Sequence, residues 1–480
     1  MSFVKIAVVA THAGAPGTLA STAFIRAMMD GFAHTGVKAR VIGLARHPSS
    51  WIAQAMEPFE TSLPWMDHRR PGHEDIRAAA STGVFDNGST GVLNSTGVIR
   101  SWNQEATLEG ALADFAAGED LIVMAYPRVF NILRMLARIA ERRGWRLIVI
   151  STEALTDAQI DSATRDHYIR CTTQCADGIW VLSEHLADYW VSHGFPRANI
   201  MLNPPAVRRI AFDQTGEPVP YSATYVGNLQ HREIDYLLDI SQDVKSRLPE
   251  YHLTIYGDTT DKRRAELLQD IDERGLASTI TVRPPVMPAE VPRILSTSWA
   301  LVLPRSTGEF STAGFPNKLG EYLASGRPVV VTGVGDIPKY LEDRRSALLV
   351  EPDRCEEFAS ALVEVLSDRT LAESVGTGGR QVAKDLLASE AVAGKILAFT
   401  TALPARVPFA ANRNGLRRTV RAWLADWTIP FIRARSLATT LRYKLGLTRS
   451  GQYGLMVVKI LIVKVLRALR LWPPAPKVKI

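Results

Sequence analysis

Short, uninterrupted runs of Val, Ile, Leu and Ala alternate along most of the chain with longer segments of helical periodicity. Such runs without polar alternation are typical of strands buried on both faces of a parallel sheet. In the first half we expect strands at 4–10, 38–44, 121–126, 146–151 and 178–183, and helices at 18–34, 128–143 and 184–193. In the second half we expect strands at 222–227, 252–257, 279–282, 300–304, 328–332 and 347–350. Two successive β/α series predict two doubly wound α/β domains.

The boundary between the two series is best placed after Asn203-Pro204-Pro205, where two prolines end a strand and a polar, turn-rich stretch follows. We therefore predict an N-terminal Rossmann-like domain at 1–205 and a C-terminal one at 206–404, with an appendage at 405–480. Ligands of doubly wound sheets bind at the carboxyl ends of the strands. A cleft between the two domains is therefore the expected site.

Residues 46–105 interrupt this rhythm, because Pro, Trp and Gly occur there in irregular order. The tetrapeptide Ser-Thr-Gly-Val begins at Ser81, Ser89 and Ser95, a spacing too irregular for a solenoid repeat. Two interpretations remain open. The segment is a surface excursion of small hairpins, or it is a lid over an acceptor substrate, since long insertions at strand ends often carry function.

Charge is unevenly distributed between the domains and the appendage. The whole chain carries a formal net charge of +7, with 46% hydrophobic and 22% charged residues, a composition typical of a soluble globular protein. Residues 401–480 hold sixteen Lys and Arg against one acid, Asp426. The first 400 residues are therefore net acidic, and the basic character belongs to the C-terminal end.

Within that basic end, residues 454–472 read GLMVVKILIVKVLRALRLW. At helical spacing Lys459, Lys464, Arg467 and Arg470 share one arc and the remaining positions are strongly apolar, which is typical of a helix lying in a membrane interface. Arg and aromatic residues interleave upstream, which suits anionic headgroups. A helix packed on another subunit or domain is the alternative. Long aliphatic runs are poor surfaces for stacking bases, so nucleic acid binding is not expected.

Three cysteines, an odd number, show no metal-binding spacing and are expected to be free thiols in a reducing compartment. The first apolar run is short and lacks a cleavage-like region, so no signal peptide is expected. No apolar stretch reaches the roughly 18 residues of a transmembrane helix. We therefore expect a cytoplasmic protein that is peripheral at the inner face of the cell membrane.

The segment FPNKLGEYLASGRPVVVTG at 315–333 combines a helix with a buried strand. Pro316 suits the first turn of a helix, Gly326 a left-handed cap, and Pro328 prevents continuation. The amino end of this helix is expected near the cleft, where its free N–H groups and Lys318 favour a diphosphate, while Glu321 suits a vicinal diol. The alternative is a solvated Lys318–Glu321 pair worth a few tenths of a kcal/mol.

The same segment resembles the donor-site motif of the retaining family-4 glycosyltransferases with the GT-B fold, in a subgroup that reads Pro-x-Lys-Leu-x-Glu-Tyr-Leu-Ala. The resemblance is weak over the first half of the chain and specific from Ala300 to Glu351. It implies that Glu321 binds the nucleotide ribose. The family's first motif glutamate would fall at position 313, where this chain has Ala313. Backbone groups of Gly314 and Phe315 are expected to replace some of its contacts.

Further segments fit the resemblance. Tyr225-Val226-Gly227-Asn228 precedes Arg232 at the family's phosphate-binding loop, where Arg232 is the one fitting cation, unless it merely opens an exposed helix. Ile255-Tyr256-Gly257-Asp258 resembles a family strand whose tight turn approaches the nucleotide. The implied donor-binding residues are Gly227, Asn228, Arg232, Asp258, Gly314, Phe315, Pro316, Asn317, Lys318 and Glu321.

On the acceptor side, the loop Thr11-His12-Ala13-Gly14-Ala15-Pro16-Gly17 follows the first strand. Its spacing is not a dinucleotide fingerprint, but its glycines allow close backbone approach to a ligand. His12, Gly14 and Gly17 are the candidates here, against the alternative of an ordinary loop histidine. Glu153 follows the strand that ends at Ser151 and is a candidate for contacting an acceptor hydroxyl, or otherwise a capping or surface residue.

The sequence therefore predicts a GT-B glycosyltransferase that transfers a sugar from a nucleotide diphosphate donor, with retention, to a glycan or lipid-linked acceptor in cell-surface polysaccharide or glycolipid synthesis. The resemblance implies neither metal nor cofactor, and Lys318 and Arg232 would stabilise the leaving diphosphate. Two alternatives remain: a catalytically idle GT-B protein that binds sugar nucleotides or glycans and is recruited to membranes, and a GT-B sugar-nucleotide epimerase.

Overall fold

The computed structural model describes residues 4–10, 19–43, 108–110, 112–126, 130–153, 162–229, 233–257, 259–286 and 289–406. The chain divides into two compact units. The first takes its described residues from 1–67, 118–129 and 147–404, and the second from 68–117, 130–146 and 405–480. The predicted insertion at 46–105 lies outside the described residues, as does the predicted tail from residue 407 onward.

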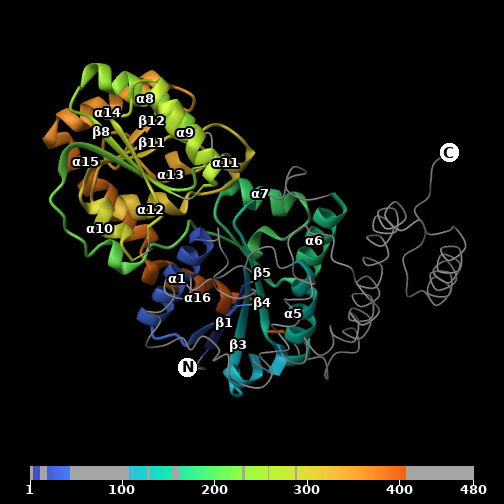
Figure 1. The fold of residues 1–480 in the computed structure, drawn as a ribbon. Coiled ribbons are helices and arrows are strands. Elements are labelled where there is room, and N and C mark those ends of the chain that lie inside the picture. Colours follow the sequence, from blue (N-terminus) through green and yellow to red (C-terminus); the bar gives the residue numbers. More distant parts are fainter. Residues whose placement is uncertain are drawn as a thin grey trace, which may run out of the picture. The chain divides into compact units, whose positions relative to one another are not determined.

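The first sheet has the strand order β2-β1-β3-β4-β5-β6 (Figure 1). Its strands are β1 Val4–Ala10, β2 Ala39–Gly43, β3 Asp120–Tyr126, β4 Arg146–Ser151, β5 Gly178–Val181 and β6 Ile200–Leu202. β1 pairs in parallel with β2 and β3, and β5 pairs in parallel with β4 and β6. The side chains of β4 and β5 are all buried, as the unbroken apolar runs predicted.

Within the first unit, helices that follow strands of this sheet in the chain include α1 Leu19–His34, α6 Ser162–Cys175 and α7 Glu184–Ser192. α7 begins where the sequence predicted, because Ser183 caps it. The Ser183 hydroxyl accepts a hydrogen bond from the Leu186 backbone N–H at 3.2 Å.

The second sheet has the strand order β12-β11-β10-β7-β8-β9. Its strands are β7 Val219–Val226, β8 His252–Tyr256, β9 Ile280–Arg283, β10 Ser298–Leu303, β11 Val329–Thr332 and β12 Leu348–Val350. Every neighbouring pair is parallel. Strands are added on one side of β7 up to β9 and then on its other side from β10. The direction in which successive strands are added to the sheet therefore reverses between β7 and β10. Ligands of doubly wound sheets bind at such a switch point.

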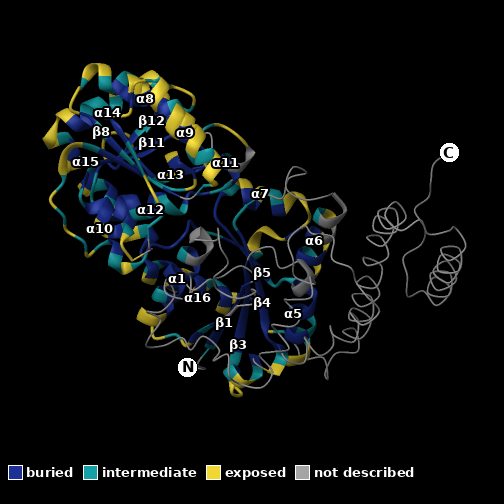
Figure 2. Cartoon of the chain, viewed as in Figure 1, coloured by how far each residue is buried: buried dark blue, intermediate teal, exposed yellow. Residues whose placement is uncertain are grey.

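The helices of the second sheet are α8 Glu233–Arg247, α9 Asp261–Glu273, α10 Val291–Ser296, α11 Glu309–Ala313, α12 Asn317–Ala324, α13 Ile337–Tyr340, α14 Cys355–Ser367 and α15 Arg369–Val382. Figure 2 shows buried residues along the middle of this sheet, while α8 and α9 present exposed residues. The sequence therefore predicted all eleven of its strand positions in the two sheets to within a few residues.

The last described helix, α16 Ser389–Ala402, packs against α1, the first helix of the chain. A π-helical turn, η3 Ala383–Leu387, precedes it. The two helices meet closely at Gly31, where an added Cβ would lie 2.0 Å from the Ser389 carbonyl oxygen. The Asp30 carboxylate accepts hydrogen bonds from the Ser389 hydroxyl at 3.0 Å and from the Arg209 backbone N–H at 3.1 Å. The Asp30 carboxylate of α1 thus binds both α16 and the segment that follows β6.

The second compact unit contains helical segments at 108–110 and 112–116 and the helix α5 Phe130–Arg143. Glu109 joins them through two ion pairs, one to Arg142 at 2.6 Å and one to Arg143 at 2.7 Å. These contacts hold α5 to the preceding helical segment within the unit.

Candidate functional site

Helix α12 carries the two side chains that the sequence singled out. It begins after Pro316, whose φ of −72° and ψ of 117° are extended, so Pro316 is the capping residue and the prediction that it lies in the first turn was wrong by one position. Gly326 adopts the left-handed conformation, with φ 75°, and β11 starts three residues later. Lys318 and Glu321 are therefore held on a short, fixed helix beside the strand ends.

Lys318 belongs to a cluster of four side chains, Tyr225, Glu233, Arg305 and Lys318, which we call the Lys318 cluster. The Lys318 ammonium donates a hydrogen bond to the Tyr225 hydroxyl at 2.9 Å and lies 4.3 Å from the centre of that ring. The Tyr225 hydroxyl donates in turn to Glu233 Oε2 at 2.8 Å. Lys318 Nζ is 3.7 Å from the same oxygen, so the alternative of a solvated Lys318–Glu321 pair does not describe this lysine.

Arg305 brings a second cation to the cluster from the end of β10. Its backbone N–H donates to the Thr332 hydroxyl at 2.8 Å, which ties the residue to β11. Its side chain is buried, with 6% exposed, and one guanidinium nitrogen donates to the Ser311 carbonyl at 3.3 Å. Among the described residues, Arg305 Nε has no hydrogen-bond acceptor. A buried guanidinium nitrogen without an acceptor is uncommon in folded proteins.

Burial controls the electrostatics of these cations. Burial lowers the pKa of the Lys318 ammonium, an effect that Glu233 opposes and Arg305 reinforces. Burial likewise lowers the pKa of Arg305, against the attraction of Glu233 and Tyr225. The pKa of the Tyr225 hydroxyl is raised well above its ordinary value by burial and by Glu233, so this hydroxyl stays protonated. Among the described residues, Glu233 thus acts on both of these partly desolvated cations.

Glu321 lies one turn beyond Lys318 and is half-buried. Burial raises the pKa of its carboxyl to about 7, although Arg208 and Lys318 both favour the charged form. A carboxyl with this pKa changes charge close to neutral pH, and perturbed groups of this kind gather at functional sites. The neighbouring Tyr322 fixes the helix, because its hydroxyl accepts a hydrogen bond from the Val226 backbone N–H at 2.7 Å.

Two glycines bring the ends of β7 and β8 close to the cluster. A Cβ at Gly227 would lie 2.3 Å from Lys318 Nζ and 2.7 Å from the Tyr225 hydroxyl. A Cβ at Gly257 would lie 2.0 Å from the Gly227 carbonyl oxygen. Both positions therefore require glycine for packing. Gly227 leaves the space that the lysine head occupies.

At position 313, where the resemblance would place a glutamate, the chain has an alanine whose backbone makes the contact. Ala313 is buried, and its carbonyl accepts a hydrogen bond from the Ser183 hydroxyl at the start of α7. Phe315 is buried and packs edge-on against Tyr340, with 5.5 Å between ring centroids. These contacts fix the backbone on both sides of Gly314.

The remaining predicted residues divide by what the structure describes. His12, Gly14, Gly17, Arg232 and Asp258 lie outside the described residues. Asn228 is exposed directly after Gly227, Asn317 is the first residue of α12, and Glu153 is half-buried just beyond β4. Ligand contacts for all of these residues stay predictions.

Sequence reasoning missed four residues of the site: Arg208, Tyr225 as a side chain, Glu233 and Arg305. One signal was available for Arg305, because it follows a predicted strand at the edge of the sheet where Gly227 and Lys318 also lie. No comparable signal marked Glu233. It follows Arg232 in the sequence, but an acid in the first turn of a helix is common for structural reasons alone.

A cavity of about 520 Å³ lies elsewhere in this domain, at the amino ends of β7 and β10, and Val219, Trp299 and Arg369 contribute to its lining. Its arginines are engaged: Arg369 pairs with Glu373 at 2.7 Å, and Arg327 donates to backbone carbonyls. The cavity includes no member of the Lys318 cluster, so it is not the candidate site.

The described residues contain neither a metal-binding cluster nor a membrane-spanning helix. No group of three or more His, Cys, Asp or Glu side chains in this part of the chain could hold a metal ion. No described helix combines the length and hydropathy needed to cross a membrane.

Comparison with known proteins agrees with this geometry. Residues 220–368 match the family model Glycosyl transferases group 1, a range that includes the whole Lys318 cluster and Glu321. A D-inositol 3-phosphate glycosyltransferase of Paenarthrobacter aurescens is 25% identical over 38% of this chain and 44% of its own length. An alpha-D-kanosaminyltransferase of Streptomyces kanamyceticus is 26% identical over 31% of this chain and 37% of its own. The matches thus span less than half the length of these relatives.

Solved structures decide the fold. Anabaena HepE in complex with UDP has a TM-score of 0.61 at 14% identity, covering 83% of this chain and 100% of that one. The fold is GT-B. Sucrose-phosphate synthase from Thermosynechococcus elongatus shares it, with a TM-score of 0.57 at 16% identity, covering 85% of this chain and 100% of that one. The two predicted Rossmann-like sheets of a GT-B protein are confirmed, and the Lys318 cluster lies at the switch point of the second.

Proposed function

We propose that this GT-B protein is a retaining glycosyltransferase of the lysine-containing subgroup of family 4. It transfers a sugar from a nucleotide diphosphate sugar to a glycan or lipid-linked acceptor in the synthesis of cell-surface polysaccharide or glycolipid. One observation carries the proposal. A half-buried lysine and a buried arginine meet at the switch point between β7 and β10, one helical turn from the Glu321 carboxyl, inside the range that matches group 1 glycosyltransferases.

The donor contacts follow from the chemistry of these groups. The diphosphate would lie against the Lys318 ammonium and the amino end of α12, with Arg305 as a second cation. The ribose hydroxyls would donate to Glu321, which accepts two hydrogen bonds when ionised. Backbone groups of Gly227, Gly314 and Phe315, together with Asn228, Arg232, Asp258, Pro316 and Asn317, complete the proposed donor set.

Leaving-group stabilisation is the proposed source of catalysis. As the bond between sugar and diphosphate breaks, negative charge grows on the phosphate, and fixed cations that are already desolvated stabilise it without reorganising. The acceptor attacks on the face that the phosphate leaves, and the phosphate accepts its proton. No protein nucleophile, metal or cofactor takes part in this scheme. His12, Gly14, Gly17 and Glu153 are proposed on the acceptor side.

A ligand screen tests the donor assignment. The full chain is screened by thermal shift against UDP-, GDP-, ADP- and dTDP-sugars, and the best donor is titrated against Glu321→Ala. We expect the variant to bind about 10- to 100-fold more weakly, because the ribose hydroxyls lose a charged acceptor. Unchanged donor affinity would show that the ribose does not lie at Glu321. A protein that binds the donor yet neither hydrolyses nor transfers its sugar would be the idle binding protein instead.

We also propose that the basic C-terminal segment holds the protein at the inner face of the cell membrane, so that a lipid-linked acceptor can reach the site. The support is the sequence pattern of residues 454–472. Deleting 405–480 should release the protein from vesicles that contain anionic lipid while the two Rossmann-like domains stay folded by circular dichroism. Equal vesicle binding by the truncated and full chains contradicts the anchor.

A further inference from the structure

Glu233 occupies an unexpected place for an acid, since it lies among the cations that the proposed diphosphate would contact. Its side chain is 12% exposed, and it faces Lys318 at 3.7 Å and the Tyr225 hydroxyl at 2.8 Å. It also attracts Arg305 electrostatically. A carboxylate so near would repel a diphosphate, and yet without it the two desolvated cations would repel each other with only Glu321 left as a nearby acid beside Lys318.

We propose that Glu233 is an internal counter-anion, which offsets part of the charge of Lys318 and Arg305 and orients Lys318 in the unliganded site, and against which an incoming diphosphate competes. The inference rests on the proposed function, because it names how the donor's charge is accommodated. It assigns Glu233 a positioning role that acts through Lys318 and Tyr225.

The hydrogen-bond chain shows how the orientation is achieved. Lys318 donates to Tyr225, and Tyr225 donates to Glu233, so the carboxylate fixes the hydroxyl proton and leaves the phenol lone pairs for the ammonium. Gly227 keeps the space beside the ammonium open. Glu233 therefore sets the direction in which the Lys318 ammonium points, and it also stabilises the charged form of that ammonium.

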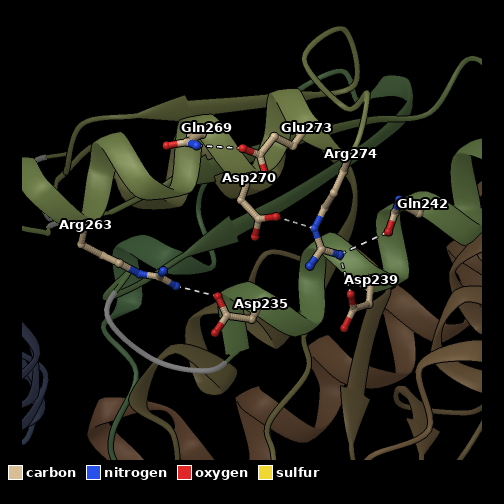
Figure 3. A network of polar contacts seen from close by, with 8 residues as sticks. All are labelled: Asp235, Asp239, Gln242, Arg263, Gln269, Asp270, Glu273 and Arg274. Carbon is tan, nitrogen blue, oxygen red and sulfur yellow. Dashed lines mark hydrogen bonds and ion pairs between the residues drawn. The ribbon is translucent and has the colours of Figure 1, made fainter.

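Helix α8 is anchored in a way that keeps Glu233 in place. Figure 3 shows an exposed network along this helix, in which Arg263 pairs with Asp235 at 2.6 Å and Arg274 contacts Asp239, Gln242 and Asp270. These contacts bind α8 to α9. They fix the first turn of α8, from which Glu233 points at the cluster while Asp235, two residues later, faces Arg263.

This arrangement provides a matched control. Asp235 is an acid of the same helical turn, but its partner Arg263 lies outside the Lys318 cluster and its side chain is 52% exposed. Glu233→Gln and Asp235→Asn each remove one negative charge and preserve the shape of the side chain. The two variants differ in whether that charge faces Lys318.

Inorganic pyrophosphate is the probe, because it tests the charged site without reference to base or sugar. Calorimetric titration of the full chain should show Glu233→Gln binding pyrophosphate about five- to tenfold more tightly than the wild type, since the repelling carboxylate is gone. Asp235→Asn should stay within about twofold of the wild type, because its charge is exposed and screened.

Thermal stability gives a second, opposite readout. Without ligand, Glu233→Gln should melt several degrees below the wild type, because two buried cations lose their counter-anion, and saturating pyrophosphate should restore most of that loss. If the single variant does not fold, Glu233→Gln combined with Lys318→Met replaces it. The double variant should recover stability and bind pyrophosphate more weakly than the wild type.

The outcomes separate this inference from the donor assignment. If Glu233→Gln binds pyrophosphate no more tightly than the wild type, or if Asp235→Asn gains as much, Glu233 is not the internal counter-anion. If pyrophosphate gives the predicted pattern but no nucleoside diphosphate binds, the donor assignment fails and the role of Glu233 stands. A wild-type chain that binds neither anion overturns both.

Discussion

Helix α8 contributes acids to two sets of charged side chains that lie in opposite environments. The network in Figure 3 pairs Asp235 and Asp239 with arginines of α9 in solvent, and both aspartates are more than half exposed, at 52% and 51%. The Lys318 cluster, reached by Glu233 at the start of the same helix, leaves 12% of the Glu233 side chain and 23% of the Lys318 side chain exposed.

The difference in exposure changes what the charges do. An exposed pair is screened by water and contributes about 0.2–1 kcal/mol, so the network holds α8 in position without large forces. In the cluster, desolvation is large and Glu233 faces both cations, with Glu321 as a second acid near Lys318. Glu233 offsets part of the positive charge, and the rest stays available for an anion. The exposed network is structural, and the cluster is the proposed donor site.

Removing the lysine should have the largest effect of all. Lys318→Met should lower kcat/KM for transfer from the donor found by screening about 10²–10³-fold, because it removes a cation aimed at the leaving phosphate. Arg263→Gln, in the exposed network, is the control and should stay within about twofold. Steady-state kinetics check both. Comparable losses in the two variants would abolish the contrast between the clusters.

A methyl group at Gly227 should act on the site and on the fold together. In Gly227→Ala the new Cβ would lie 2.3 Å from Lys318 Nζ and 2.7 Å from the hydroxyl of the buried Tyr225, so donor binding should weaken about tenfold and stability should fall by about 1–3 kcal/mol. Titration and chemical denaturation measure the two effects. A large loss of stability with unchanged affinity would place the importance of Gly227 in packing alone.

The pKa of Glu321 predicts a pH dependence that the exposed acids should lack. Burial raises its pKa to about 7, and ribose hydroxyls bind the ionised form, so donor affinity should be full above pH 7 and fall as pH drops through that value. At pH 6 we expect a loss of up to about tenfold. Glu321→Gln should bind weakly at every pH. Titrations between pH 5.5 and 8.5 give the profile, and a flat wild-type curve contradicts the assignment.

The Glu321 carboxyl should also lower the stability of the fold at neutral pH. Its pKa is raised in the folded state from an ordinary value of 4.5 to about 7. Between these two pH values the folded chain binds more protons than the unfolded chain, so the free energy of unfolding falls as pH rises from about 4.5 to 7. Above pH 7, Glu321→Gln should be more stable than the wild type by about 1–2 kcal/mol. Denaturation at pH 5 and pH 8 tests the sign.

The smallest effect belongs to the exposed network. Asp235→Asn should cost less than about 1 kcal/mol, and that cost should shrink further in 1 M salt. Urea denaturation at low and high salt measures it. If Asp235→Asn instead lowers the free energy of unfolding by several kcal/mol, and by the same amount at both salt concentrations, the network contributes more to stability than its exposure indicates.

Much of the fold could be predicted from the sequence, because parallel strands buried on both faces leave unbroken apolar runs. Lys318 and Glu321 could be predicted for another reason: proline, glycine and proline fix the ends of their helix, so the positions of its side chains follow from local rules. Glu233 and Arg305 could not be predicted in this way. Their roles depend on which strand ends lie side by side, and the order β10-β7-β8 places residues that are about 70 positions apart in the chain into one cluster.

The contact between α1 and α16 bears on how this protein is made. The first sheet and its helix α1 emerge from the ribosome early, but the surface that packs on α1 at Gly31 comes from residues near 389. Until that segment is synthesised, a nascent N-terminal domain exposes an apolar helix face. We therefore expect a fragment ending at residue 205 to require chaperones or to aggregate, and the domain that is translated first to be completed last.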